Sequence, residues 1–70
     1  MMSETYVLAN GRRLPVVLPC TLEGFLQGQG LLPRSVVVEL NGEAVAPSEF
    51  SARTLGSGDR LEVVQITAGG

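Results

Sequence analysis

With only 70 residues, the chain is expected to fold as a single domain, close to the lower size limit for one hydrophobic core and too small for an active-site cleft between two lobes. Its net charge of −2, from five arginines and seven carboxylates, is unlike the clustered basic face of nucleic-acid-binding proteins. The lack of histidine and lysine removes the commonest general base and metal ligand and excludes a phosphate-binding P-loop, so any nucleotide chemistry has to take place on a partner.

The first predicted element is a β-hairpin that turns at Asn10 and Gly11. Both residues tolerate the positive φ of a type I′ turn, and β-favouring runs, "TYVLA" and "RRLPVVL", lie on either side. A two-residue turn places Val7 opposite Leu14, and alternation then puts one set of side chains on the core face. Pro15 lacks a backbone N–H, which places the second strand at a sheet edge. The predicted core-facing set is Val7, Ala9, Leu14, Val16 and Leu18.

A short helix is predicted to follow Thr21. The Thr21 hydroxyl can cap it, and Glu23 places a negative charge in the first turn, where the helix dipole favours one. Gly30 is expected to end the helix. Its two internal glycines each cost about 1 kcal/mol relative to alanine, so the helix depends on packing against the sheet. The predicted buried stripe is Leu22, Phe25 and Leu26.

Asn41 and Gly42 predict a second hairpin, between the runs "SVVVEL" and "EAV". The segment "APSEF" is then expected to form a turn of helix or 3₁₀ helix with Phe50 directed inward, and "GSGD" a tight turn. The run "RLEVVQI" alternates as a last strand, with Leu61 and Val63 facing inward.

This order of elements predicts an α+β fold. Hairpins need only two-residue loops, whereas a parallel return after the helix needs a crossover. The compact solution is a mixed sheet of four to five strands with one main helix across one face and the first and last strands adjacent in its middle, which is the β-grasp, or ubiquitin-like, arrangement. The other face, with Tyr6, Leu8 and Val64, stays partly open as a surface for a partner. Residues 1–4 and 67–70 are predicted to be flexible ends of this one domain, which spans residues 1–70.

Several features favour a cytoplasmic protein. No apolar run reaches the roughly 20 residues that span a bilayer, and the first residues lack the basic region and apolar stretch of a secretory signal. Cys20 is the single cysteine, which suits a reducing compartment. For Cys20 itself, a sulfur relay and a small buried hydrophobic residue are both open, and the second is the commoner role.

The chain resembles the ubiquitin-like sulfur carrier proteins over residues 5–70, and within them it is most similar to the sulfur carrier of thiamine thiazole biosynthesis. The resemblance is carried by "PCTLEGFL" at the helix start, "VVELNGEAV" at the second hairpin and "GDRLEVVQITAGG" at the end. The final Gly69 and Gly70 are specific only in combination with this architecture. The small subunit of molybdopterin synthase is the close rival, but that family tends to carry proline before its Gly-Gly, and this chain has none there.

The resemblance implies a role as a protein substrate of other enzymes rather than as an enzyme. An activating enzyme would adenylate the carboxylate of Gly70 with MgATP, a persulfide donor would supply sulfur to form a thiocarboxylate, and thiazole synthase would accept that sulfur. ATP and Mg are thus expected on the partner, with no cofactor or metal bound by this chain. Gly69 and Gly70, which follow Ala68 in the tail, suit the task, because residues without a Cβ let the backbone approach a nucleotide closely, and an ionised sulfur is the reactive form.

The last strand also predicts a partner surface. Val64 and Ile66 alternate away from the core, so they are expected to face the open side of the sheet just before the tail. We expect one or both to contact partner enzymes, with Arg60 and Glu62 as flanking charges. Ordinary exposed hydrophobic residues are the alternative.

Other functions remain open on the sequence alone. They are a sulfur carrier for molybdopterin synthesis or tRNA thiolation, a ubiquitin-like modifier that forms isopeptide bonds to target lysines, and a β-grasp binding module whose Gly-Gly is coincidental. Two further motifs are set aside. Asp59 and Glu62 are interpreted as solvated charges rather than as a catalytic pair, and "GSGDRL" lacks the third glycine and the following helix of a dinucleotide-binding loop.

Overall fold

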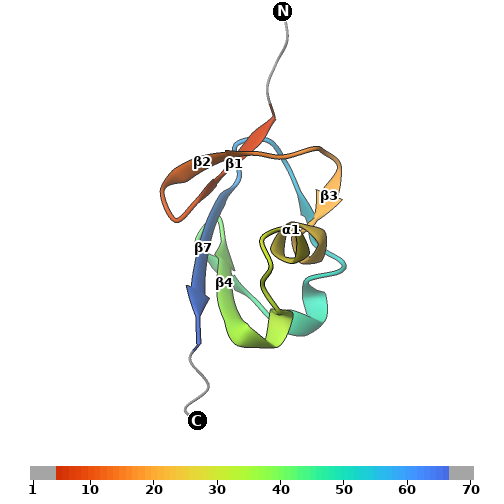
Figure 1. The fold of residues 1–70 in the computed structure, drawn as a ribbon, viewed down its shortest axis with the longest axis vertical. Coiled ribbons are helices and arrows are strands. Elements are labelled where there is room, and N and C mark those ends of the chain that lie inside the picture. The colour runs from red at the N-terminus through yellow and green to blue at the C-terminus, as the bar shows by residue number, and fades with distance from the viewer. Residues whose placement is uncertain (1–4, 67–70) are drawn as a thin grey trace, which may run out of the picture.

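The computed structural model describes residues 5–66 and confirms the predicted fold. A mixed five-stranded sheet has the order β2-β1-β7-β4-β5, and the helix α1 lies across one of its faces (Figure 1). The last strand, β7, is central, because it pairs in parallel with β1 and antiparallel with β4. The strands of this sheet are β1 (Tyr6–Ala9), β2 (Arg12–Pro15), β4 (Val36–Leu40), β5 (Glu43–Val45) and β7 (Arg60–Gln65).

Both Asn-Gly hairpins form as predicted. In the first, Asn10 has φ 52° and Gly11 has φ 81°, as a type I′ turn requires, and Val7 lies opposite Leu14. The second strand lies at the sheet edge. It is shorter than the run 12–18: the ladder ends at Pro15 opposite Tyr6, the Val16 N–H still donates to the Thr5 carbonyl at 3.0 Å, and Val17 is 87% exposed.

The helix α1 (Leu22–Gly28) is short and capped as expected. The Thr21 Oγ1 accepts a hydrogen bond of 3.0 Å from the backbone N–H of Gly24. The N–H groups of Leu22 and Glu23 donate to the carbonyls of Arg53 and Phe50, at 2.8 and 3.0 Å. Two 3₁₀ turns complete the backbone, η1 (Pro33–Ser35) and η2 (Pro47–Glu49). None of the helices in residues 5–66 has the length and the apolar character of a membrane span.

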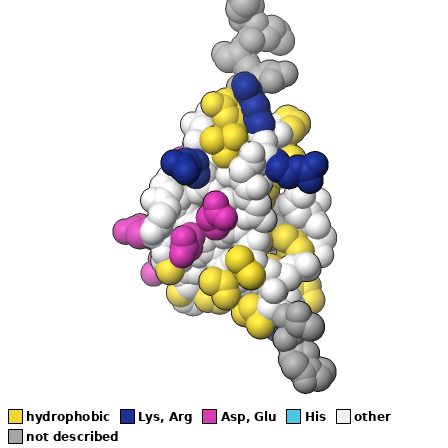
Figure 2. Space-filling model, turned by 90° about the vertical axis from the view of Figure 1, so that its left-hand side faces the viewer, with side chains coloured by type: hydrophobic (Ala, Val, Ile, Leu, Met, Phe, Trp, Pro, Cys, Tyr) yellow, Lys and Arg dark blue, Asp and Glu magenta, His cyan; other side chains and the backbone are white. Residues whose placement is uncertain are grey.

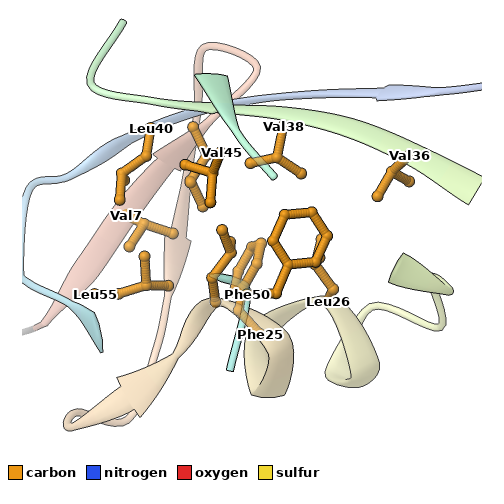
Figure 3. Packing of buried hydrophobic residues seen from close by; sticks show 11 residues of the cluster. Val7, Phe25, Leu26, Val36, Val38, Leu40, Val45, Phe50 and Leu55 are labelled. Atoms are coloured by element: carbon orange, nitrogen blue, oxygen red, sulfur yellow. The ribbon is translucent and has the colours of Figure 1, made fainter. Parts of the chain in front are cut away.

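The core lies between α1 and the sheet (Figure 3). The stripe of α1 meets alternate residues of β1, β4 and β7, and Phe50 is buried beneath them, as predicted. The other residues predicted to face the core pack against this cluster and are partly buried: Ala9, Leu14, Val16, Leu18 and Val63. The buried members are Val7, Leu22, Phe25, Leu26, Val36, Val38, Leu40, Val45, Phe50, Leu55 and Leu61.

One feature was absent from the predicted order of elements. A second, two-stranded sheet joins β3 (Cys20–Thr21) to β6 (Thr54–Leu55) in antiparallel fashion. It ties the start of α1 to the chain that leads into the last strand. Cys20 lies in β3, partly buried against the core, and its Sγ–H donates to its neighbour's carbonyl, the Thr21 O, at 3.4 Å. This placement is that of a small hydrophobic residue.

Candidate partner surface on the open sheet face

The candidate site is the open sheet face around β7, together with the chain that follows it. On the hairpin side, the Asn10 N–H donates to the Leu61 carbonyl at 2.8 Å. On the other side, β4 pairs with β7 along its full length, from Val36 opposite Gln65 to Leu40 opposite Leu61. The last described residue, Ile66, still donates its N–H to the Ser35 carbonyl at 2.8 Å. The strand that precedes the predicted tail is therefore bonded to the domain on the β4 side as far as Ile66.

The four residues predicted as the partner surface lie on one face, away from α1. Arg60 and Glu62 are exposed, Val64 is 60% exposed and Ile66 is 49% exposed. Their neighbours Leu61 and Val63 face the core. The outward alternation of this strand is thus confirmed, while contact with a partner stays a prediction.

Val37 also belongs to this surface, although it was not predicted there. Val37 lies directly opposite Val64 across the antiparallel ladder and is 50% exposed. The middle valine of "SVVVEL" alternates outward, which is a signal that the sequence contains. Together Val37, Val64 and Ile66 form an exposed cluster that we call the apolar patch. It borders the point where β7 ends.

A pair of like charges lies beside the apolar patch. Glu39 of β4 is directly opposite Glu62 of β7, and like charges in this position destabilise a sheet. In the described part of the chain the ion pairs are made by Arg53, with Glu43 at 3.6 Å and with Glu49 at 3.4 Å. Neither Glu39 nor Glu62 takes part in these ion pairs. A basic group from outside the domain would offset their repulsion.

The opposite end of the open face is basic and less apolar than the sequence predicted. The Arg13 guanidinium lies 4.0 Å from the centroid of the Tyr6 ring, and Tyr6 and Leu8 are only partly exposed. Figure 2 shows the resulting distribution: arginines lie around the upper end with some hydrophobic side chains between them, carboxylates lie in the middle, and further hydrophobic side chains gather at the lower end, where β7 finishes. The open face is therefore divided by charge rather than uniformly apolar.

The predicted tail residues Ala68, Gly69 and Gly70 lie outside the described residues. Within residues 5–66, no group of three histidine, cysteine, aspartate or glutamate side chains is placed to hold a metal ion. The chemistry that the described residues offer is recognition by an apolar patch and flanking charges.

Comparison with known proteins agrees with this architecture. The family model described as "ThiS family" matches residues 7–70. The crystal structure of a thiamine biosynthesis protein (ThiS) from Geobacter metallireducens superposes with a TM-score of 0.79 at 28% identity, covering 93% of this chain and 99% of that one. A solution structure of a thiamine biosynthesis protein from the same organism gives 0.77 at 28% identity, with 93% and 87% covered.

A curated relative extends the comparison. A thiazole synthase from Magnetococcus marinus is 42% identical over 50 residues, which cover 71% of this chain but only 15% of that protein. The match thus concerns a small part of a much longer chain. The family model, by contrast, matches this chain from β1 through its last residue. With the sheet order and the helix position described above, this match shows that the chain belongs to the ThiS family of ubiquitin-like sulfur carriers.

Proposed function

We propose that this chain carries sulfur for the thiazole of thiamine, with the carboxylate of Gly70 as the point of attachment. The observation that carries the proposal is the position of β7. This strand is hydrogen-bonded on both sides in the middle of the sheet, and the apolar patch lies where it ends. A partner that docks on the patch therefore receives the following residues at a defined point. Membership of the ThiS family supports the same role.

The proposed chemistry takes place on the partner enzymes. A carboxylate is a poor electrophile, so the Gly70 carboxylate first attacks the α-phosphorus of MgATP in the activating enzyme, which forms an acyl-adenylate and releases pyrophosphate. The terminal sulfur of a persulfide then attacks the acyl carbon and displaces AMP. This leaves an acyl disulfide, and a second thiol attacks its donor-side sulfur, which forms a new disulfide with the donor and releases the thiocarboxylate on Gly70. This chain acts as a carrier in these steps and not as a catalyst.

The open face supplies the recognition in this proposal. The apolar patch offers exposed hydrophobic area for burial in a complex, and the charges of Arg60 and Glu62 beside it fix orientation. A basic group on the activating enzyme, placed against Glu39 and Glu62, would relieve the repulsion between them. Recognition and chemistry are thus separated along the chain, because the patch lies before the tail.

Thiazole synthase is proposed as the enzyme that accepts the sulfur. The protein from Magnetococcus marinus that matches 50 residues of this chain is itself named thiazole synthase. A segment similar to this carrier within such a chain supports a connection between the two activities. The persulfide donor is proposed on chemical grounds alone, since sulfur must arrive in a nucleophilic form.

Deletion of Gly70 tests the proposal. The variant is expected to lose pyrophosphate and AMP release with the activating enzyme, because the attacking carboxylate is displaced by one residue. Its thermal unfolding is expected to match that of the wild type, since the buried core lies entirely within residues 7–61. Nucleotide turnover that survives the deletion, or a large fall in Tm, would contradict this assignment.

A further inference from the structure

Each of the two turn asparagines also binds β7 through its side chain. The Asn41 Oδ1 accepts from the Arg60 N–H at 2.9 Å, and its Nδ2 donates to the Asp59 carboxylate at 3.2 Å. The Asn10 Oδ1 accepts from the Val63 N–H at 2.7 Å, and its Nδ2 donates to the Val63 carbonyl at 3.0 Å. The two asparagines therefore fasten different parts of the strand, Asn41 at its start and Asn10 toward its end.

Asn10 takes the place of a strand residue. The parallel pairing of β1 with β7 ends at Ala9 opposite Leu61, because the chain turns back at Asn10. The next backbone groups on this edge of β7 belong to Val63. The amide of Asn10 bonds to both of them, so a side chain extends the ladder beyond the end of its own strand.

Beyond Val63 the hairpin gives β7 no further support. In residues 5–66, the hydrogen bonds from the hairpin to β7 end with those of the Asn10 amide, while β4 continues on the other side to Val36 opposite Gln65. A cavity of about 330 Å³ lies next to this edge, and Asn10, Val63 and Gln65 are among its lining residues. The last part of β7 is therefore paired on one side only.

We propose that Asn10 is a positioning residue for the C-terminal segment. A strand end that is paired on one side frays more readily than one paired on both, and a frayed end must be ordered when it binds. By holding Val63 on the hairpin side, the amide of Asn10 keeps the end of β7 in the sheet, so the residues after Ile66 leave from a fixed point. The benefit to activation rests on the proposed function, whereas the effect on strand order does not.

A pair of matched variants tests this inference. Both asparagines have φ 52°, which glycine adopts without steric cost, so Asn10→Gly and Asn41→Gly each keep the turn and remove only the amide. Hydrogen exchange of the Val63 and Ile66 amides is measured by NMR, and KM and kcat are measured for the activating enzyme. Because the Ile66 N–H bonds to the Ser35 carbonyl on the β4 side, its exchange reports the order of the strand end rather than the deleted bond.

Asn10→Gly is expected to accelerate exchange at both amides by about tenfold, the factor that corresponds to the loss of one or two hydrogen bonds. Its KM for activation is expected to rise by roughly three- to tenfold with kcat nearly unchanged, because the variant differs from the wild type only in how well the end of β7 is ordered before binding. Asn41→Gly is expected to leave Ile66 exchange and KM at wild-type values, even where it lowers Tm by the same amount.

A conservative variant completes the test. Asn10→Asp keeps the acceptor for the Val63 N–H and tolerates positive φ, so it is expected to fall between the wild type and Asn10→Gly, and it replaces Asn10→Gly if that variant does not fold. Unchanged Ile66 exchange in the Asn10 variant, or a KM equal to that of Asn41→Gly, would overturn the inference. The hydrogen-exchange measurement needs no partner enzyme, so it decides the role of Asn10 in strand order by itself. A wild-type chain that the activating enzyme does not turn over would count against the proposed function.

Discussion

Val63 and Val64 have the same side chain but opposite surroundings. Val63 packs against the core, and Val64 is 60% exposed on the open face, because successive residues of a strand point to opposite faces. This difference could be predicted from the sequence by alternation within "RLEVVQI". The pairing of Val64 with Val37 could not, because it depends on the register between β4 and β7, which no local pattern fixes.

The apolar patch leads to a prediction at Val64. Val64→Asp is expected to weaken binding to the activating enzyme by roughly tenfold or more, because it places a charge in the centre of a surface that the complex would bury. Affinity can be measured by titration calorimetry with the purified enzyme.

Val17→Asp is the matched control for that substitution. Val17 is 87% exposed in the loop after the edge strand β2 and is not part of the apolar patch, so the same change of side chain is expected to leave the affinity unaltered. Equal affinities for the two variants would remove Val64 from the partner surface.

The side-chain hydrogen bonds of the two turn asparagines could not be predicted from the sequence. Asn10 and Asn41 were predicted to lie in turns because asparagine tolerates positive φ, and both have φ 52°. Their amides bond to Val63 and to Arg60, residues distant in sequence. Such bonds become visible only once the tertiary structure places β7 beside both turns.

Among the elements, the hairpins could be predicted because their signal is local. Asn10 with Gly11, and Asn41 with Gly42, each specify a turn within two residues. The pair β3 and β6 has no such signal, because each strand has two residues and their pairing joins Cys20 to the distant Leu55. Long-range pairing of this kind follows from the packing of the whole domain.

The glycines of α1 and of the first turn give a prediction for the elements. Gly28→Ala is expected to raise the free energy of unfolding by about 0.5 to 1 kcal/mol, because alanine is the better helix former, and a Cβ at this position meets no atom within 4 Å. Thermal and urea unfolding followed by circular dichroism would measure the change.

Gly11→Ala is the control for Gly28→Ala. A Cβ there also meets no atom within 4 Å, but Gly11 has φ 81°, which alanine adopts only with strain, so the variant is expected to lose about 1 kcal/mol or more. If both substitutions shifted stability in the same direction, backbone conformation would not be the deciding factor.

For the whole molecule, the sheet order β2-β1-β7-β4-β5 connects the fold with the proposed function. A central last strand gives a small domain both a firm core strand, with Leu61 fully buried, and a firm base for the residues that follow it. The sequence predicted this arrangement from the order of its elements. The division of the open face into basic, acidic and apolar zones (Figure 2) depends on the register of four strands and could not be read from the chain. Ala68, Gly69 and Gly70, the predicted point of attachment, lie outside the described residues.

The intact mass of the protein decides whether other enzymes load sulfur onto the carboxylate of Gly70. The chain is produced together with its activating enzyme in a sulfur-replete cell and purified without a C-terminal tag, with the Gly70 deletion as the control. We expect a mass gain equal to the replacement of one oxygen by one sulfur in the wild type and none in the deletion. An unchanged mass beside an activating enzyme that turns over ATP on this chain, or adducts linked to the lysines of other proteins, would contradict it.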